Sequence, residues 1–136
     1  MNKVFPFFLI LLIFGQCRKD DPLPEIASII GVWKMTAYSV GDSLVSSSKE
    51  ESLVRIIRPD GVIVDDRNSQ GCCPPSKYFF NGKEFVPKPS APIEPMDCRL
   101  VSCYPCIEMK ITTPNSDPNT LAIECDGRYT MFARVK

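Results

Sequence analysis

The feature that most constrains this chain is a group of cysteines confined to its second half. In an exported protein, an even number of cysteines indicates a disulfide framework, which can hold loops that a small core could not. The spacing does not choose among the many possible pairings, but two adjacent cysteines are expected to bond to different partners. The disulfide candidates are Cys72, Cys73, Cys98, Cys103, Cys106 and Cys125.

The same region is rich in proline. Between Gly71 and Cys106 lie seven prolines and five of the six cysteines, mostly in two irregular segments, residues 66–76 and 87–105. Loops of this length are usually functional or cross-linked. We therefore expect a cap of disulfide-stapled, proline-rich loops at one end of the domain, with Cys125 tying it to a core strand.

The N-terminal residues indicate whether these cysteines can be oxidised. Lys3 precedes an apolar run, residues 4–15, and a charged cluster, residues 18–21, follows it. The run is shorter than the ~20 residues that a spanning helix needs, and it suits the hydrophobic region of a secretory signal. Residues 1–16 are therefore expected to be a signal peptide, and the remainder to be exported.

The end of the run, Ile13-Phe14-Gly15-Gln16, followed by Cys17, resembles the lipobox of bacterial lipoproteins of the Bacteroidota type. Gln16 stands where a small residue is usual, and Phe14 is bulkier than the common pattern. The resemblance implies that Cys17 becomes the N-terminus and is acylated on its thiol and its amine. The alternative is an ordinary signal peptide that leaves Cys17 as a spare thiol.

Several acyl chains anchor a protein stably where one does not. Residues 17–28 would then form the tether, because they contain two prolines and several charges that favour an extended spacer. The expected location is the cell envelope, with the chain lipid-anchored to the outer membrane on its periplasmic or surface side.

Composition excludes several classes of function. The chain has no histidine, so Ser-His-Asp, Cys-His and histidine-dependent zinc mechanisms cannot operate in it. Loss of Lys3 with the signal leaves 15 basic residues against 16 acidic ones. No basic stripe is visible, so nucleic acid is not an expected partner.

Residues 29–136 fit one domain and read as strands joined by turns. Pro59-Asp60-Gly61 and Asn81-Gly82 are strong hairpin signals. About eight strands are expected, a number that must close or stack to hide its edges. The predicted fold is all-β, a small antiparallel up-and-down barrel, with a β-sandwich as the alternative. The strand regions are residues 31–40, 52–65 (two strands), 77–86 (two strands), 105–112, 120–125 and 128–135.

The stretch from Ile29 to Val40 resembles the first strand of lipocalin-like domains, with the Gly-x-Trp signature at Gly31 and Trp33. The hairpin at 58–61 and the last strand are also typical of lipocalin-like lipoproteins. The resemblance implies that Trp33 closes the narrow end of the barrel, with a basic residue of the last strand, Arg134 or Arg128, packed across it in a cation–π contact. The chain departs from the family in being shorter and in its proline- and cysteine-rich insertions.

Cys103-Tyr104-Pro105-Cys106 is the one stretch with catalytic potential. A redox C-x-x-C needs a helix N-terminus to lower its thiol pKa, whereas a strand is expected here. A zinc site of Cys73, Cys98, Cys103 and Cys106 is the other alternative, disfavoured in an oxidising compartment. Structural disulfides are the favoured interpretation, and no enzyme activity, metal or cofactor is expected.

The leading hypothesis is a non-enzymatic, membrane-anchored, lipocalin-like lipoprotein that binds a small apolar ligand in its barrel. No residue could be assigned to ligand binding. The alternative is a surface or envelope module that binds a protein partner through the proline-rich loop at residues 86–95, because prolines lower the ordering cost of binding. An oxidoreductase using Cys103 and Cys106 is a third, more distant hypothesis.

Overall fold

The computed structural model describes Leu23 and residues 25–48, 53–103 and 106–136. The predicted signal peptide, Cys17 and part of the tether lie outside these residues. No helix in the described part of the chain has the length and hydropathy needed to span a membrane. The elements are η1 (Ala27–Ile29), β1 (Gly31–Val40), β2 (Ser43–Ser46), β3 (Val54–Ile57), β4 (Ile63–Val64), β5 (Tyr78–Phe80), β6 (Lys83–Phe85), β7 (Met109–Thr112), η2 (Pro114–Ser116), β8 (Thr120–Cys125) and β9 (Arg128–Arg134).

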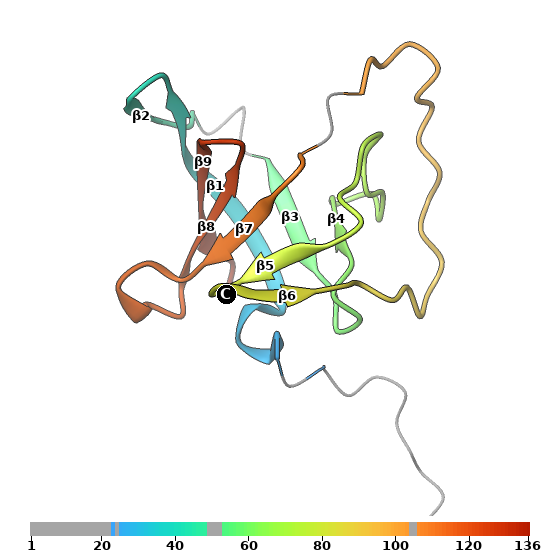
Figure 1. The fold of residues 1–136 in the computed structure, drawn as a ribbon, viewed down its shortest axis with the longest axis horizontal. Helices are drawn as coiled ribbons and strands as arrows, with labels where there is room; N and C mark the ends of the chain where they lie inside the picture. Colours follow the sequence, from blue (N-terminus) through green and yellow to red (C-terminus); the bar gives the residue numbers. More distant parts are fainter. Residues whose placement is uncertain (1–22, 24, 49–52, 104–105) are drawn as a thin grey trace, which may run out of the picture.

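The strands form one strongly curled sheet, a half-barrel (Figure 1). Its order is β4-β3-β1-β9-β8-β7-β5-β6, and β2 pairs with the far end of β1. The all-β prediction is confirmed. The antiparallel up-and-down order is not what the sheet shows, because β5 and β7 run parallel and β4 and β6 end the strand order without pairing. The strands of the described residues form a single sheet and not the two stacked sheets of the alternative.

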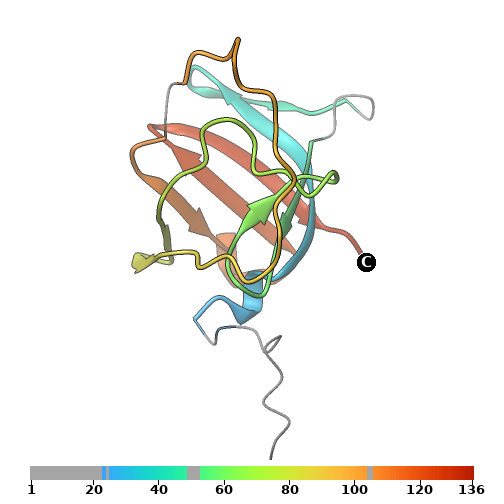
Figure 2. The ribbon, with the colours of Figure 1, turned by 90° about the vertical axis from the view of Figure 1, so that its right-hand side faces the viewer.

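The parallel pair has a local cause. A parallel neighbour needs a long crossover connection rather than a tight hairpin. Residues 86–108 supply that connection between β6 and β7, and this is the proline- and cysteine-rich segment. The segment runs over the open side of the half-barrel, in front of the sheet in Figure 2.

Both predicted hairpins form where the turn residues indicate. β3 and β4 flank Arg58-Pro59-Asp60-Gly61, in which the Gly61 N–H donates to Arg58 O at 2.9 Å. β5 and β6 flank Asn81-Gly82, and both residues have positive φ, as a two-residue hairpin turn requires. Local turn chemistry therefore sets the register of these four strands.

The concave face of the sheet carries the core. Trp33, Tyr78 and Phe132 are its largest fully buried side chains. They come from β1, β5 and β9, so the core spans the whole curl. Phe85 and five aliphatic residues complete the cluster: Ile26, Ile29, Ile57, Ile111 and Leu121.

Two of the predicted strands differ in detail from the structure. The strand expected at residues 105–112 is shorter, because β7 begins only at Met109, and Ile107 is 80% exposed. β1 contains a bulge opposite β9, between Met35 and Ala37, which interrupts its regular alternation.

Trp33 and Arg134 are in contact at one end of the half-barrel. The Arg134 guanidinium lies 4.3 Å from the centre of the Trp33 ring, so the contact expected of this pair is present. Its Nη1 donates to Ile30 O at 2.8 Å and its Nη2 to Ser28 O at 2.6 Å. Trp33 Nε1 donates to Ile29 O at 2.8 Å. Together these bonds fix η1 across the end of the sheet.

Gly31 makes this arrangement possible. Its φ is +140°, and a Cβ there would lie 2.9 Å from Arg134 Nη1. We therefore expect Gly31→Ala to lower the free energy of unfolding by about 2–3 kcal/mol through backbone strain and displacement of the guanidinium. Urea unfolding measures the change.

Gly41→Ala is the matched control. Gly41 also has a positive φ, +58°, but nothing lies within 4 Å of a Cβ there. Gly41→Ala should lower the free energy of unfolding by only about 1 kcal/mol, which is the strain of a non-glycine residue in the left-handed conformation. Equal losses in the two variants would contradict the role assigned to the Gly31–Arg134 contact.

Candidate functional site

Three disulfides organise the cysteine-rich region: Cys72–Cys98, Cys73–Cys103 and Cys106–Cys125. The two adjacent cysteines bond to different partners, as expected. Cys106–Cys125 joins the end of the long crossover to the last residue of β8. The cap is therefore stapled twice to the loop after β4 and once to the core sheet.

These pairings remove the two chemical alternatives. Cys103 and Cys106 bond to different partners, so they do not form a redox pair. The four thiolates of the considered zinc site are all consumed in disulfides. Cys106 and Cys125 also lie near Asp126, but their bond to each other leaves no thiolate there for a metal.

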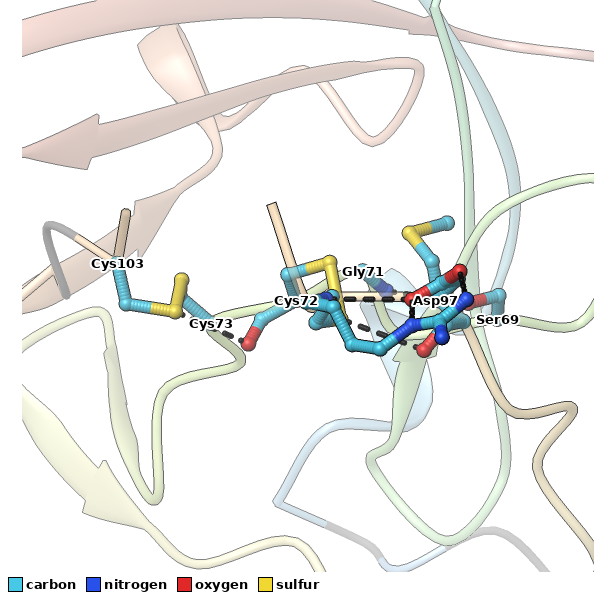
Figure 3. The surroundings of a disulfide bond; sticks show 9 residues. Ser69, Gly71, Cys72, Cys73, Asp97 and Cys103 are labelled. Carbon is cyan, nitrogen blue, oxygen red and sulfur yellow. Dashed lines mark hydrogen bonds and ion pairs between the residues drawn. A yellow bond between two sulfur atoms is a disulfide. The ribbon is translucent and has the colours of Figure 1, made fainter. Parts of the chain in front are cut away.

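The disulfides formed by Cys72 and Cys73 (Figure 3) join the body to the two ends of a short segment, residues 98–103, which we name the tip. The Val101 N–H donates to Cys98 O at 3.1 Å, so the tip begins with a turn. Leu100, at the third position of that turn, is 100% exposed. The two disulfides and this turn therefore constrain the tip at both of its ends.

The segment from Lys88 to Glu94 is tied to the β3–β4 hairpin and the loop that follows it. Arg58 Nη2 donates to Ala91 O and its Nη1 to Pro92 O, each at 3.1 Å. The Glu94 N–H donates to Asn68 O at 3.0 Å. This segment continues from β6 and lies along the β4 side, so it spans the gap between the two unpaired edges.

Asp60 is the centre of this closure. Its side chain is buried, and its Oδ2 accepts hydrogen bonds from the Ser90 N–H at 2.8 Å and the Ser90 hydroxyl at 3.1 Å. The same oxygen pairs with Arg58 Nη2 at 2.7 Å, and Oδ1 accepts from the Val62 N–H at 3.1 Å. We name Arg58, Asp60 and Ser90 the clasp.

The clasp favours the ionised carboxylate. Burial by itself raises the pKa of Asp60, but hydrogen bonds from Ser90, Val62 and Arg58 outweigh it and hold the pKa below its ordinary value. The clasp is therefore charged and fully formed at neutral pH.

Side-chain packing completes the closure. The Tyr78 hydroxyl donates to Gly61 O at 3.2 Å, and Phe85 lies so close to Gly61 that any Cβ there would collide with its ring. The Tyr78 and Phe85 rings are 5.2 Å apart. Aromatic residues of the β5–β6 hairpin thus cover the β3–β4 turn in place of a hydrogen-bonded ladder. Burial raises the pKa of Tyr78, with a smaller contribution from Asp60, so its hydroxyl stays protonated.

Beneath the loops, the concave face retains a small pocket of about 140 Å³. β3, β4, β5 and β7 supply Arg55, Ile63, Tyr78 and Met109. The loops supply the rest of the lining: Gln70, Cys73, Pro74, Pro75 and Pro87. The pocket is therefore part polar and part apolar.

Comparisons of the chain with protein-family models, with curated proteins and with solved structures give no match. The candidate site is therefore defined from the structure alone.

The sequence-based site residues fall in two places. Gly31, Trp33 and Arg134 meet at the end closed by η1, whereas Arg128 lies at the exposed start of β9. The six cysteines meet on the other side, in the cap. The sequence analysis did not predict a role for the clasp, Leu100 or Arg55. The turn signal at Asp60 is the one indication of the clasp, because an aspartate in a turn often accepts hydrogen bonds from nearby backbone N–H groups.

The clasp predicts that Asp60→Asn destabilises the protein. The amide would keep one acceptor oxygen but lose the charge that pairs with Arg58, and its NH₂ would face donors. We expect a loss of about 2–3 kcal/mol at pH 7, typical for hydrogen bonds to a buried charged group, measured by urea unfolding.

The pH dependence gives a second readout of the same variant. Because folding lowers the pKa of Asp60, its contribution is complete above the ordinary aspartate pKa of about 3.9 and declines as the pH falls through the lower folded value. The difference between wild type and Asp60→Asn should therefore shrink at low pH. Asp97→Asn, which alters an exposed ion pair with Arg99, is the control and should change little. A gap that stays constant with pH would contradict the assignment.

Proposed function

We propose that this chain is a non-catalytic, envelope-anchored module that binds a protein partner through the tip at residues 98–103. One observation carries the proposal. Leu100 is fully exposed on a turn whose two flanking cysteines, Cys98 and Cys103, are bonded to adjacent residues of the body. Exposed apolar side chains that lie together mark protein interaction sites, and Met96, Leu100 and Val101 are three exposed apolar residues within six positions of the chain.

Rigidity supports this role energetically. A loop that is already ordered loses less conformational entropy when it binds than a flexible one does. Burying a leucine side chain at an interface contributes about 1.5–3 kcal/mol. Further exposed apolar residues extend the proposed binding surface: Val101 within the tip, and Met96 and Ile107 on either side of it in the sequence.

The position of the tip also supports the proposal. In Figures 1 and 2 the tip lies at the end of the molecule opposite η1. An acylated Cys17 would tether the chain from the η1 side. The tip would then face away from the membrane, toward other proteins of the envelope or surface.

The segment first favoured for partner binding, residues 86–95, has a different role in this proposal. Half of its ten residues are hydrogen-bonded to Arg58, Asp60 or Asn68, namely Lys88, Ser90, Ala91, Pro92 and Glu94. Its deletion would open the half-barrel rather than remove a free loop. The binding element is therefore placed at the tip that follows it.

The lipocalin-like assignment with a small apolar ligand is the second candidate. Its support is the cluster of Gly31, Trp33 and Arg134 together with a pocket on the concave face. The pocket, at about 140 Å³, is too small for a lipid chain or another large apolar ligand, since sites for drug-sized molecules usually measure roughly 300–1,000 Å³. The sheet, with its parallel β5–β7 pair, also departs from the closed, antiparallel up-and-down barrel that this candidate implies. Both observations favour the protein-binding proposal over a lipocalin-like ligand site.

A photo-crosslinking residue at position 100 tests the proposal in the native envelope. Crosslinking from this position should give one discrete partner, which purified protein then binds in solution. Leu100→Asp should weaken that binding at least ~10-fold, since it loses the burial of a leucine and places a charge in the interface.

Leu44→Asp is the matched control, because Leu44 is also highly exposed, at 63%, but lies on β2. It should bind the partner normally. Equal losses in the two variants, or equal capture from positions 44 and 100, would overturn the tip as the binding element.

The disulfides give an independent test. The pair Cys98→Ser with Cys103→Ser releases the tip but keeps Leu100, the clasp and Cys106–Cys125. We expect weaker partner binding, measured by calorimetry. Near-UV circular dichroism should show little change in the packing of the core. Unchanged affinity would show that rigidity of the tip is not needed.

A further inference from the structure

Arg55 places a positive charge on the concave face of the sheet. It stands opposite Trp33 in the antiparallel pairing of β1 and β3, and residues paired across strands share a face. Trp33 is completely buried on that face. Arg55 therefore points into the half-barrel, where it forms part of the pocket wall.

The pocket surrounds this charge with apolar walls. Ile63, Tyr78 and Met109 come from three strands, and Pro74 and Pro75 cover them from the stapled loop. Gln70 is the other polar side chain of the lining, and Arg55 is its one charged residue among those described. The site thus places one guanidinium beside apolar side chains in a small pocket.

The charge is only partly compensated. Burial lowers the pKa of Arg55, and the nearby Asp65 opposes this effect. Within the described residues, however, no carboxylate reaches ion-pair distance of Arg55. Asp65 Oδ1 already accepts from the Arg67 and Ser69 N–H groups at 2.9 and 2.8 Å. An anion that entered the pocket would therefore improve the electrostatics of the folded protein.

We propose that this pocket binds a small organic carboxylate, whose charged group pairs with Arg55 and whose apolar part lies against Ile63, Tyr78 and Met109. The planar guanidinium matches a carboxylate with two parallel hydrogen bonds. A cavity of about 150 Å³ holds one benzene ring, so the ligand class is a single ring or a short branched chain. The proposal does not depend on the protein-binding tip.

The size and charge of the pocket favour an organic carboxylate over a lipid, a neutral apolar molecule or an inorganic anion. A lipid chain exceeds the chamber, and a neutral apolar molecule would further desolvate the guanidinium without pairing it. An inorganic anion would satisfy Arg55 but leave the apolar walls unused.

The test uses benzoate as the probe and benzyl alcohol as its neutral counterpart of nearly equal size. Binding to the wild-type domain is followed by NMR, through the methyl signals of Met109 and Ile63. We expect benzoate to bind at least ~10-fold more tightly than benzyl alcohol, because only the carboxylate pairs with Arg55. Equal affinities would overturn the proposal.

Variants assign the effect to Arg55. Arg55→Met keeps a long apolar stem without the charge and should abolish the preference for benzoate, whereas Arg55→Lys should retain part of it. Arg128→Met removes an exposed arginine on β9 and should leave it unchanged. An unaltered amide spectrum outside the pocket confirms folding of each variant. A preference that survives Arg55→Met, or sulfate binding as tightly as benzoate, would contradict the carboxylate site.

Discussion

The ionic clasp of Arg58, Asp60 and Ser90 is the interaction on which the rest of this structure depends. A curled sheet must hide its two outer edges, and here β4 and β6 do not pair with each other. The segment that leaves β6 instead crosses to the β3–β4 hairpin, where the buried carboxylate of Asp60 binds both Ser90 and Arg58. The buried ion pair and its hydrogen bonds thus link the β4 and β6 edges, which backbone hydrogen bonds between strands would otherwise join.

The half-barrel is closed by a loop and not by hydrogen bonds between strands, and this explains why the chain is rich in proline and cysteine. The described part of the proline-rich segment contains no helix or strand, so the clasp and the disulfides hold it in place. Two of the disulfides hold the tip carrying Leu100, and the third fixes the segment to β8. At the opposite end, Arg134 packs over Trp33. The two ends are therefore built differently, one from core side chains and one from stapled loops.

Sequence reasoning reached the local features and missed the long-range ones. Pro59-Asp60-Gly61 and Asn81-Gly82 set both hairpins because their backbone preferences are local. The disulfide pairing and the parallel β5–β7 contact depend on distant residues, which no spacing rule specifies. Arg55 was overlooked because it lies in a run of β-branched residues, where alternation cannot show which face is buried. Its inward direction follows only from its register with Trp33.

Amide hydrogen exchange at Ser90 tests the clasp most directly. Ser90 is an exposed residue in a segment without secondary structure, so its N–H would ordinarily exchange quickly. Because that N–H is bonded to Asp60, the account predicts exchange slowed to a rate close to that of the β3–β4 hairpin. Exchange as fast as in an unstructured peptide would show that the segment is not held there, and that the half-barrel is closed in some other way.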